Sequence, residues 1–210
     1  MERRDGQNTR EAILVAATEE FAEKGYDGAS LRGICVRAGV NIALANRYFG
    51  SKEALYKRVA QRLFGDLGSP LANLADGVDS QSSWKKAIET WVGSFLYMTT
   101  TTNRPQSLCA KLFRHEVTHP SKFQMELKSE FGRPVYHSLR SLVSMAVSDE
   151  EQIDLRTASI WAQVAVYALA DSVWLESFRP SGVPLEEWAE KLCRQICEDV
   201  FAQLKYRGES

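Results

Sequence analysis

The sequence lacks long apolar runs, strand-like alternation of apolar and polar residues, and internal repeats. A membrane-spanning helix needs about 20 mostly apolar residues, and no run of even eighteen occurs, so we expect no contact with a membrane. The N-terminal MERRDGQNTRE has no apolar segment of the kind found in signal peptides. The chain has 210 residues, 44% of them hydrophobic, and a mean hydropathy of -0.29, which predicts a soluble cytoplasmic protein with its own core.

Cysteine is scarce, with four residues in the whole chain: Cys35, Cys109, Cys193 and Cys197. Their spacing shows no disulfide framework. Cys193 and Cys197 lie four residues apart on a helical stretch, which would also suit a metal or redox pair. We interpret them as buried thiols in a reducing compartment, and we predict neither a metal site nor a cofactor.

The net charge of -1 hides an uneven distribution of charge along the chain. Residues 1–62 carry a balance of +3, and the remainder carries a balance of -4. Within residues 30–62 seven basic residues face a single acid, Glu53. A solvated charged surface would account for such a patch, but its position on the helix pair described next favours a polyanionic partner.

Residues 30–49, SLRGICVRAGVNIALANRYF, predict two short helices joined by a tight turn. Ser30 and Asn41 are residue types that cap helix N-termini with a side-chain oxygen. Gly39 tolerates the left-handed conformation that ends a helix. Two short helices about a glycine turn match the helix-turn-helix, whose second helix enters the DNA major groove.

The rest of the chain predicts helices only, so the expected fold class is all-α. A three-helix head is joined by a fourth helix, expected over 51–67, to a helical body. The stretch 65–83 is rich in glycine and serine and predicts a loop, which sets the domains at 8–68 and 83–207. Residues 148–178 predict the most apolar helix, buried on more than one side.

Residues 9–56 resemble the TetR family of one-component bacterial transcriptional regulators. The matching segments are TREAILVAATEEFAEKGYDGASLRGI and RAGVNIALANRYFGSKEALY. The variant VNIALANRYFGSKEALY, with HEVTHPS and RPVYHSL further on, looks most like the CecR-type branch. The resemblance implies a ligand-responsive repressor that binds a palindromic operator as a homodimer, in the bacterial cytoplasm and on the nucleoid when bound.

The DNA-contacting residues follow from side-chain chemistry and from the match to the family's recognition helix. Asparagine can pair with adenine, arginine with guanine, and Ile or Ala can touch a thymine methyl. Tyrosine, lysine and a helix N-terminus suit phosphates. The predicted set is Ser30, Arg32, Asn41, Ile42, Ala43, Asn46, Arg47, Tyr48 and Lys52. Because Asn46 and Arg47 stand where many relatives carry aromatic residues, the operator sequence cannot be inferred from a relative.

The two last long helices predict a dimer seam built as a four-helix bundle, although they could also bury their faces within one chain. In the family, a small molecule enters the helical body and releases the DNA, which is coupling between two sites. The predicted pocket residues are Trp91, Phe95, Phe113, Arg114, His115, Trp161 and Tyr167. Aromatic residues at helical spacing also suit an ordinary core, and no pattern identifies the ligand.

Two other classes of function fit parts of the sequence. His115-Glu116-Val117-Thr118-His119 spells the H-E-x-x-H signature of zinc metallohydrolases. Pro120 would end the helix there, and no pattern for a third ligand follows, so we expect the protein not to be an enzyme. The other alternative is a helical interaction module with a head that does not bind DNA, which the salt dependence of binding would distinguish.

Overall fold

The computed structural model describes residues 2–100, 105–170 and 172–207, and within these ranges every regular element is helical. This confirms the all-α prediction. The described helices are α1 (Glu2–Gly28), α2 (Leu31–Ala38), α3 (Ile42–Phe49), α4 (Lys52–Ala72), α5 (Gln81–Thr100), α6 (Pro105–Thr118), α7 (Gln124–Leu127), α8 (Arg133–Ser144), α9 (Glu150–Leu169), α10 (Ser172–Phe178) and α11 (Leu185–Gln203). A 3-10 helix covers Leu74–Gly77, and a π-helix covers Lys128–Gly132. None of the described helices is long and apolar enough to span a bilayer.

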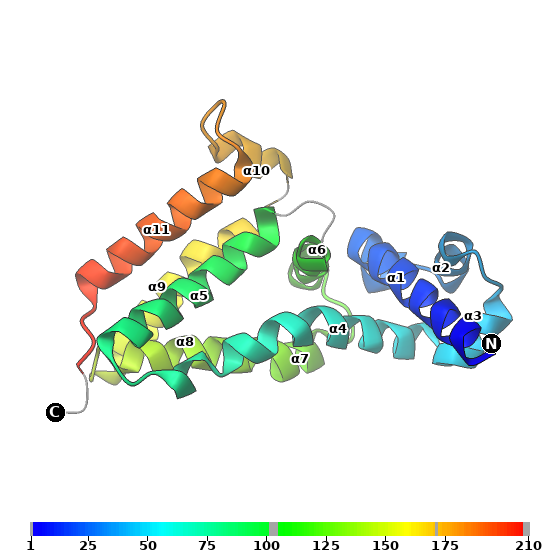
Figure 1. Ribbon diagram of the computed structural model, residues 1–210, viewed down its shortest axis with the longest axis horizontal. Coiled ribbons are helices and arrows are strands. Elements are labelled where there is room, and N and C mark those ends of the chain that lie inside the picture. Colours follow the sequence, from blue (N-terminus) through cyan, green and yellow to red (C-terminus); the bar gives the residue numbers. More distant parts are fainter. Residues whose placement is uncertain (1, 101–104, 171, 208–210) are drawn as a thin grey trace.

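The molecule is elongated, with α1 to α3 gathered at one end and α5, α8, α9 and α11 at the other (Figure 1). Helix α4 runs from the first group toward the second, and α6 lies between them (Figure 1). Helix α1 packs against α2, α4 and α6, whereas α5 packs against α11, α9 and α6. The first group therefore contacts the rest of the chain through α4 and α6.

Helix α4 is longer than the sequence predicted, because it continues to Ala72 through the stretch expected to be a loop. Gly65 and Gly68 face the segment that leads into α8: a β-carbon on Gly68 would lie 3.5 Å from Cγ2 of Val135, and one on Gly65 would lie 3.8 Å from Cε1 of Phe131. Both distances are ordinary van der Waals contacts, so α4 packs against its neighbour at these positions without a requirement for glycine. Packing of this kind offsets the weak intrinsic helix propensity of glycine.

The expected single helix over 148–178 is divided into α9 and α10. The side chain of Arg114 on α6 donates a 2.8 Å hydrogen bond from Nε to the carbonyl of Leu169, and Nη2 donates to the carbonyl of Ala170. These carbonyls lie at the end of α9, where backbone acceptors have no partner inside the helix. The contact of Arg114 with these carbonyls therefore stabilises the break between α9 and α10.

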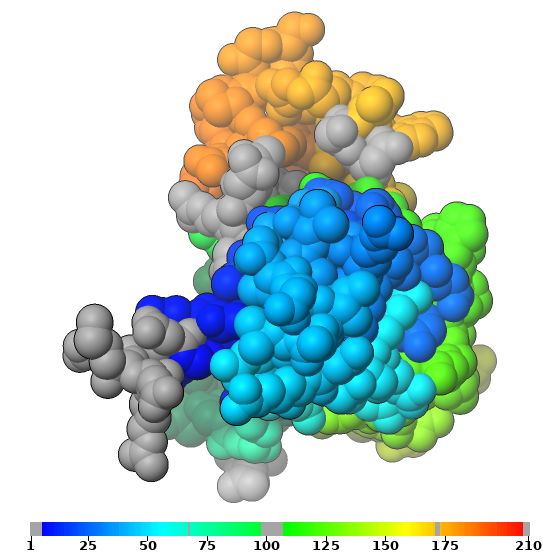
Figure 2. Space-filling model, turned by 90° about the vertical axis from the view of Figure 1, so that its right-hand side faces the viewer, coloured from blue at the N-terminus to red at the C-terminus, as the bar shows by residue number. Residues whose placement is uncertain are grey.

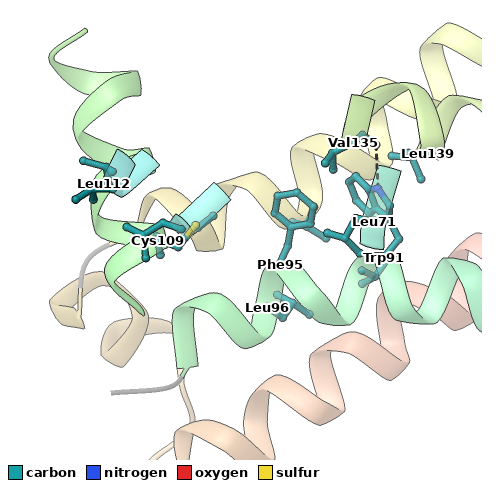
Figure 3. Packing of buried hydrophobic residues seen from close by; sticks show 14 of the residues in the cluster. Leu71, Trp91, Phe95, Leu96, Cys109, Leu112, Val135 and Leu139 are labelled. Carbon is teal, nitrogen blue, oxygen red and sulfur yellow. Dashed lines mark hydrogen bonds between the residues drawn. The ribbon is translucent and has the colours of Figure 1, made fainter. Parts of the chain in front are cut away.

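The core of the body is built around aromatic residues of α5 (Figure 3). Trp91 is fully buried, and its indole Nε1 donates a 3.1 Å hydrogen bond to the carbonyl of Val135 on α8 (Figure 3). Trp84, also fully buried, donates in the same way to the carbonyl of Leu142 at 2.7 Å. Two tryptophans two turns apart therefore fix α5 along the length of α8.

Candidate nucleic-acid interface

The helix pair forms as the sequence predicted, and its caps account for its shape. The Ser30 hydroxyl accepts a 3.0 Å hydrogen bond from the backbone N–H of Gly33 at the start of α2. Gly39 has φ 66 and ψ 30, the left-handed conformation that ends this helix. Oδ1 of Asn41 accepts a 2.8 Å hydrogen bond from the N–H of Leu44 and starts α3. Ser30 and Asn41 therefore stabilise the helix pair, in addition to any contact that they make with DNA.

Helix α3 presents one face to solvent and one to the protein. Ala45 is only 1% exposed and packs inward. Ile42, Ala43, Asn46 and Arg47 are all exposed, Ile42 by 44%. Positions four apart lie on the same side of a helix, so Ile42 with Asn46 and Ala43 with Arg47 form one outward face. The end of the molecule that carries α1 to α3 faces the viewer in Figure 2.

The predicted phosphate ligands are less exposed than the base-contacting residues. Tyr48 is half-buried, and its hydroxyl lies beside α1, because a β-carbon on Gly6 would be 3.1 Å from it. Lys52 is also half-buried; its Nζ lies 4.4 Å from the centre of the Tyr26 ring and 3.5 Å from the carbonyl oxygen of Asp27. Tyr48 belongs to α3 itself, and Lys52 occupies the first turn of α4.

The cationic patch of residues 30–62 is smaller in the folded protein than in the sequence. Arg37 forms ion pairs at 2.7 to 3.4 Å with three acids of α1: Glu19, Glu20 and Glu23. Hydrogen bonds to Glu23 and Glu19 raise the pKa of Arg37. Arg62 pairs with Glu11 at 2.5 Å, and Lys57 pairs with Glu126 at 2.9 Å. Among the ion pairs of the described residues, none involves Arg32, Arg47 or Lys52. These three cations, all near the helix pair, are therefore available to a polyanion.

Two family models match the chain. Residues 13–59 match the model of bacterial regulatory proteins of the tetR family, and residues 85–198, more than half of the chain, match the C-terminal domain of the HTH-type transcriptional dual regulator CecR. The chain belongs to the TetR family. Its C-terminal body is of the CecR type.

Curated relatives align over only part of this chain. CecR of Shigella flexneri is 40% identical over 63 residues, which cover 30% of this chain and 28% of that protein. The transcriptional repressor Rv3405c of Mycobacterium tuberculosis is 46% identical over 52 residues, covering 25% and 28%. The activator FasR of Mycolicibacterium smegmatis is 34% identical over 83 residues, covering 39% and 38%. The chain therefore spans well under half the length of these relatives.

Solved structures share the fold over nearly the whole chain. A putative fatty acid metabolism regulator of Clostridium perfringens superposes with a TM-score of 0.66 at 17% identity, covering 93% of this chain and all of that one. A transcriptional regulator of Rhodococcus sp. Rha1 gives 0.62 at 21% identity, covering 93% and 97%. At such identities these structures support the arrangement of the TetR-family head and body, and nothing about ligands.

The residues predicted to line an effector pocket are only partly gathered. Trp91, Phe95 and Trp161 form one cluster, with the Trp161 ring 5.7 Å from Trp91 and 5.3 Å from Phe95, centre to centre. Tyr136 joins it, 5.7 Å from Trp161, and the sequence interpretation had missed this residue. Tyr167 instead packs against Trp188 of α11 at 5.8 Å.

The three predicted pocket residues on α6 make different contacts. Phe113 is half-buried against the core, and Arg114 binds the carbonyls at the end of α9. His115 contacts the head, where its Nε2 donates a 3.1 Å hydrogen bond to the carbonyl of Glu23 on α1. Two surface hollows of about 400 and 500 Å³ open beside α1 and α2, and neither is lined by any predicted effector residue.

The H-E-x-x-H segment contributes to the junction of head and body. Glu116 is only 6% exposed, accepts a hydrogen bond from the hydroxyl of Tyr56 on α4, and accepts another from the N–H of Ser121 at 3.3 Å. Burial, together with Glu116, raises the pKa of Tyr56 well above its ordinary value, so the hydroxyl remains a donor. His119 lies beyond the end of α6, with Nδ1 3.0 Å from the Thr118 hydroxyl. Among described side chains, no group of three or more His, Cys, Asp or Glu is placed to hold a metal.

Gly25 should tolerate no side chain, because it lies where α1 meets α6. Its φ of 68 and ψ of 179 belong to a region that is essentially restricted to glycine. A β-carbon there would also lie 3.1 Å from Nδ1 of His115. We expect Gly25→Ala to lower the free energy of unfolding by about 1–3 kcal/mol, the usual cost of such a backbone conformation.

Urea unfolding of the two proteins measures this loss. Gly77→Ala is the matched control, because Gly77 has no positive φ and nothing lies within 4 Å of an added β-carbon. An equal effect of both substitutions would contradict a special role for Gly25.

Proposed function

We propose that this chain regulates transcription by binding double-stranded DNA at a specific operator, through the outward face of α3. The support is the exposed row of Asn46, Arg47, Ile42 and Ala43, whose chemistry suits base edges in the major groove. Arg32 in α2 and Lys52 in the first turn of α4 form no ion pair among the described residues, and we expect them to contact phosphates. Membership of the TetR family favours the same function. We assign the DNA-binding head to residues 8–68 and the effector-binding and dimerisation body to residues 83–207.

We further propose that the protein acts as a homodimer. A single short helix contacts few base pairs, whereas a two-fold dimer recognises two half-sites about one helical turn apart or a multiple of it. Helices α9 and α10 leave large apolar side chains exposed, between 52% and 75%: Leu155, Val166, Val173, Trp174 and Phe178. Exposed apolar surface of this extent marks an interaction site, and a second copy of the same helices would cover it as a four-helix bundle.

The proposed regulation is repression relieved by a small molecule that binds the body, with the protein in the cytoplasm and on the nucleoid while bound to DNA. Trp91 and Phe95 are buried in the packed core, so we propose that a ligand binds beside the half-buried rings that pack on them, Tyr136 and Trp161. Arg114 and His115 connect this region of the chain to α9 and to the head respectively. A ligand that shifts α6 would change both contacts, and this would couple the body to the head.

Arg47 gives the sharpest test of the groove assignment. We expect Arg47→Ala to weaken binding to a selected operator by about 1–3 kcal/mol and to relax the preference at one base position, since a bidentate arginine–guanine contact is worth about that much. Fluorescence anisotropy with the operator and with single-base variants measures both effects. Arg156→Ala on α9, where Arg156 contacts Gln203, is the matched control and should bind as the parent does.

Lys52→Ala should weaken specific and non-specific binding alike and make the salt dependence less steep, because a phosphate contact carries no sequence information. Parent-like operator binding by both the Arg47 and the Lys52 variants would contradict the assignment of this face. Binding by the parent that ignores both salt and sequence would contradict DNA recognition altogether.

A further inference from the structure

Two cysteines of α11 lie together on the side of this helix that packs against α5. Cys193 and Cys197 are one helical turn apart, on the same side of α11. Sγ of Cys193 lies 4.0 Å from the carbonyl oxygen of Glu89 on α5, and a β-carbon on Gly93 would be 3.5 Å from it. The pair therefore points toward α5, where a glycine leaves room for the sulfur.

The two thiols differ in accessibility and in the direction of their pKa shifts. Cys197 is only 3% exposed, whereas Cys193 is half-buried and can be reached from solvent. The neighbouring Cys197 lowers the pKa of Cys193, whereas Cys193 together with burial raises the pKa of Cys197. The expectation that both thiols are buried is therefore wrong for Cys193, which is only half-buried.

A disulfide does not fit this spacing. Residues four apart on a helix have β-carbons about 5–6 Å apart, whereas a disulfide requires about 3.5–4.5 Å. Formation of a Cys193–Cys197 disulfide would therefore have to distort the turn of α11 that carries both residues, and α11 packs against α5. A metal ion between the two sulfurs suits this wider separation, because two metal–sulfur bonds span a longer distance than one sulfur–sulfur bond.

We propose that Cys193 and Cys197 form a two-thiolate binding site for Cu(I). Thiolates select soft ions. Zinc and iron–sulfur sites take four protein ligands, or three with an open position, and no described group of three or more His, Cys, Asp or Glu surrounds this pair. Cu(I) is a soft ion that is satisfied by two thiolates in linear coordination. Binding releases one proton from each thiol and changes no oxidation state.

The site would hold its ion between two helices of the body. The half-buried Cys193 would be the ligand that the ion reaches first from solvent, and the buried Cys197 would be the second sulfur ligand. Because both thiols face α5, occupancy stabilises the contact between α5 and α11. This inference does not depend on DNA binding, and its test uses no DNA.

The test is a titration of the reduced full-length protein with Cu(I), without oxygen, against the coloured competitor bathocuproine disulfonate. We expect the chain to retain one Cu(I), and X-ray absorption of that sample to show two sulfur ligands. Cys193→Ser and Cys197→Ser should each lose the bound ion. Because Cys193 is half-exposed, its substitution should leave the helical circular dichroism spectrum unchanged, so loss of copper in that variant is not loss of folding.

The matched control is Cys109→Ala, which removes a thiol that is fully buried and whose pKa burial raises to about 12. This variant should retain copper as the parent does. The proposal would be overturned if the competitor removed all copper from the parent, or if the Cys193 and Cys197 variants retained it. Formation of a Cys193–Cys197 disulfide in air, with no copper retained under reducing conditions, would also overturn it.

Discussion

Glu116→Ala is expected to lower the free energy of unfolding by about 2–5 kcal/mol. Glu116 is the buried acceptor for two groups, the hydroxyl of Tyr56 and the N–H of Ser121. Both Tyr56 and Ser121 are buried, so water does not replace the lost partner at low cost. A buried donor left without an acceptor costs about 1–3 kcal/mol, and the substitution creates two. Urea unfolding followed by circular dichroism measures the loss.

A double-mutant cycle separates this hydrogen bond from other effects of the substitution. Tyr56→Phe removes the donor and keeps the ring, which packs 4.9 Å from the Phe21 ring and 5.3 Å from the Phe123 ring. If the two groups act as a pair, Glu116→Ala should cost less when combined with Tyr56→Phe than in the parent. Glu190→Ala, at an exposed position of α11, should change stability by no more than about 0.5 kcal/mol. Additive losses would show that Tyr56 and Glu116 are not coupled.

The position of this pair gives it a role beyond stability. Tyr56 belongs to α4, which leaves the head, and Glu116 belongs to α6, which lies between head and body (Figure 1). His115, the preceding residue, contacts the end of α1 through the carbonyl of Glu23. One turn of α6 therefore contacts both α4 and α1. His115 and Glu116 of the H-E-x-x-H pattern therefore both have structural partners at this junction, whereas His119 lies beyond the end of α6.

Trp91→Ala is expected to cost about 3–5 kcal/mol, the usual range for removing a buried aromatic side chain. Trp91 is fully buried among rings of α5 and α9, with its centre 4.7 Å from Phe95 and 5.7 Å from Trp161. Its loss also leaves the carbonyl of Val135 without the indole donor. The midpoint of urea unfolding should fall accordingly, because this residue joins α5 to both α8 and α9.

Trp91→Phe is the matched variant, since it keeps a ring and removes only the indole N–H and part of the volume. We expect it to lose clearly less stability than Trp91→Ala. A close-packed site retains a cavity after truncation, and that cavity is costly. If Trp91→Ala lowered the free energy of unfolding by less than about 1 kcal/mol, the cluster would therefore have to be loosely packed. That result would favour a pre-formed ligand cavity at Trp91 over the packed core shown in Figure 3.

The helix pair could be predicted from the sequence because its signals are local. Ser30, Gly39 and Asn41 each determine a boundary through a cap within three residues, and the structure has all three caps. The outward face of α3 follows from the same short spacing. Propensity and capping are sufficient where the structure depends on near neighbours.

Features that depend on distant segments could not be predicted in this way. The break between α9 and α10 is stabilised by Arg114, more than fifty positions away in sequence. Arg37 does not contribute to the cationic patch, because it is paired with acids of α1. No local sequence pattern reveals how α1 lies relative to α2. The effector residues were chosen by aromatic spacing, which is the same for a core and for a pocket, so the set mixed packed residues such as Trp91 with junction residues such as His115.

The most direct test of the central claim is selection of DNA from a random pool by the purified full-length protein, followed by sequencing. If α3 recognises the major groove in a two-fold dimer, the recovered sequences should share an inverted repeat, and Arg47→Ala should lose the preference at one symmetric pair of positions. Recovery of no common sequence, or of a single half-site by a monomeric protein, would contradict the account.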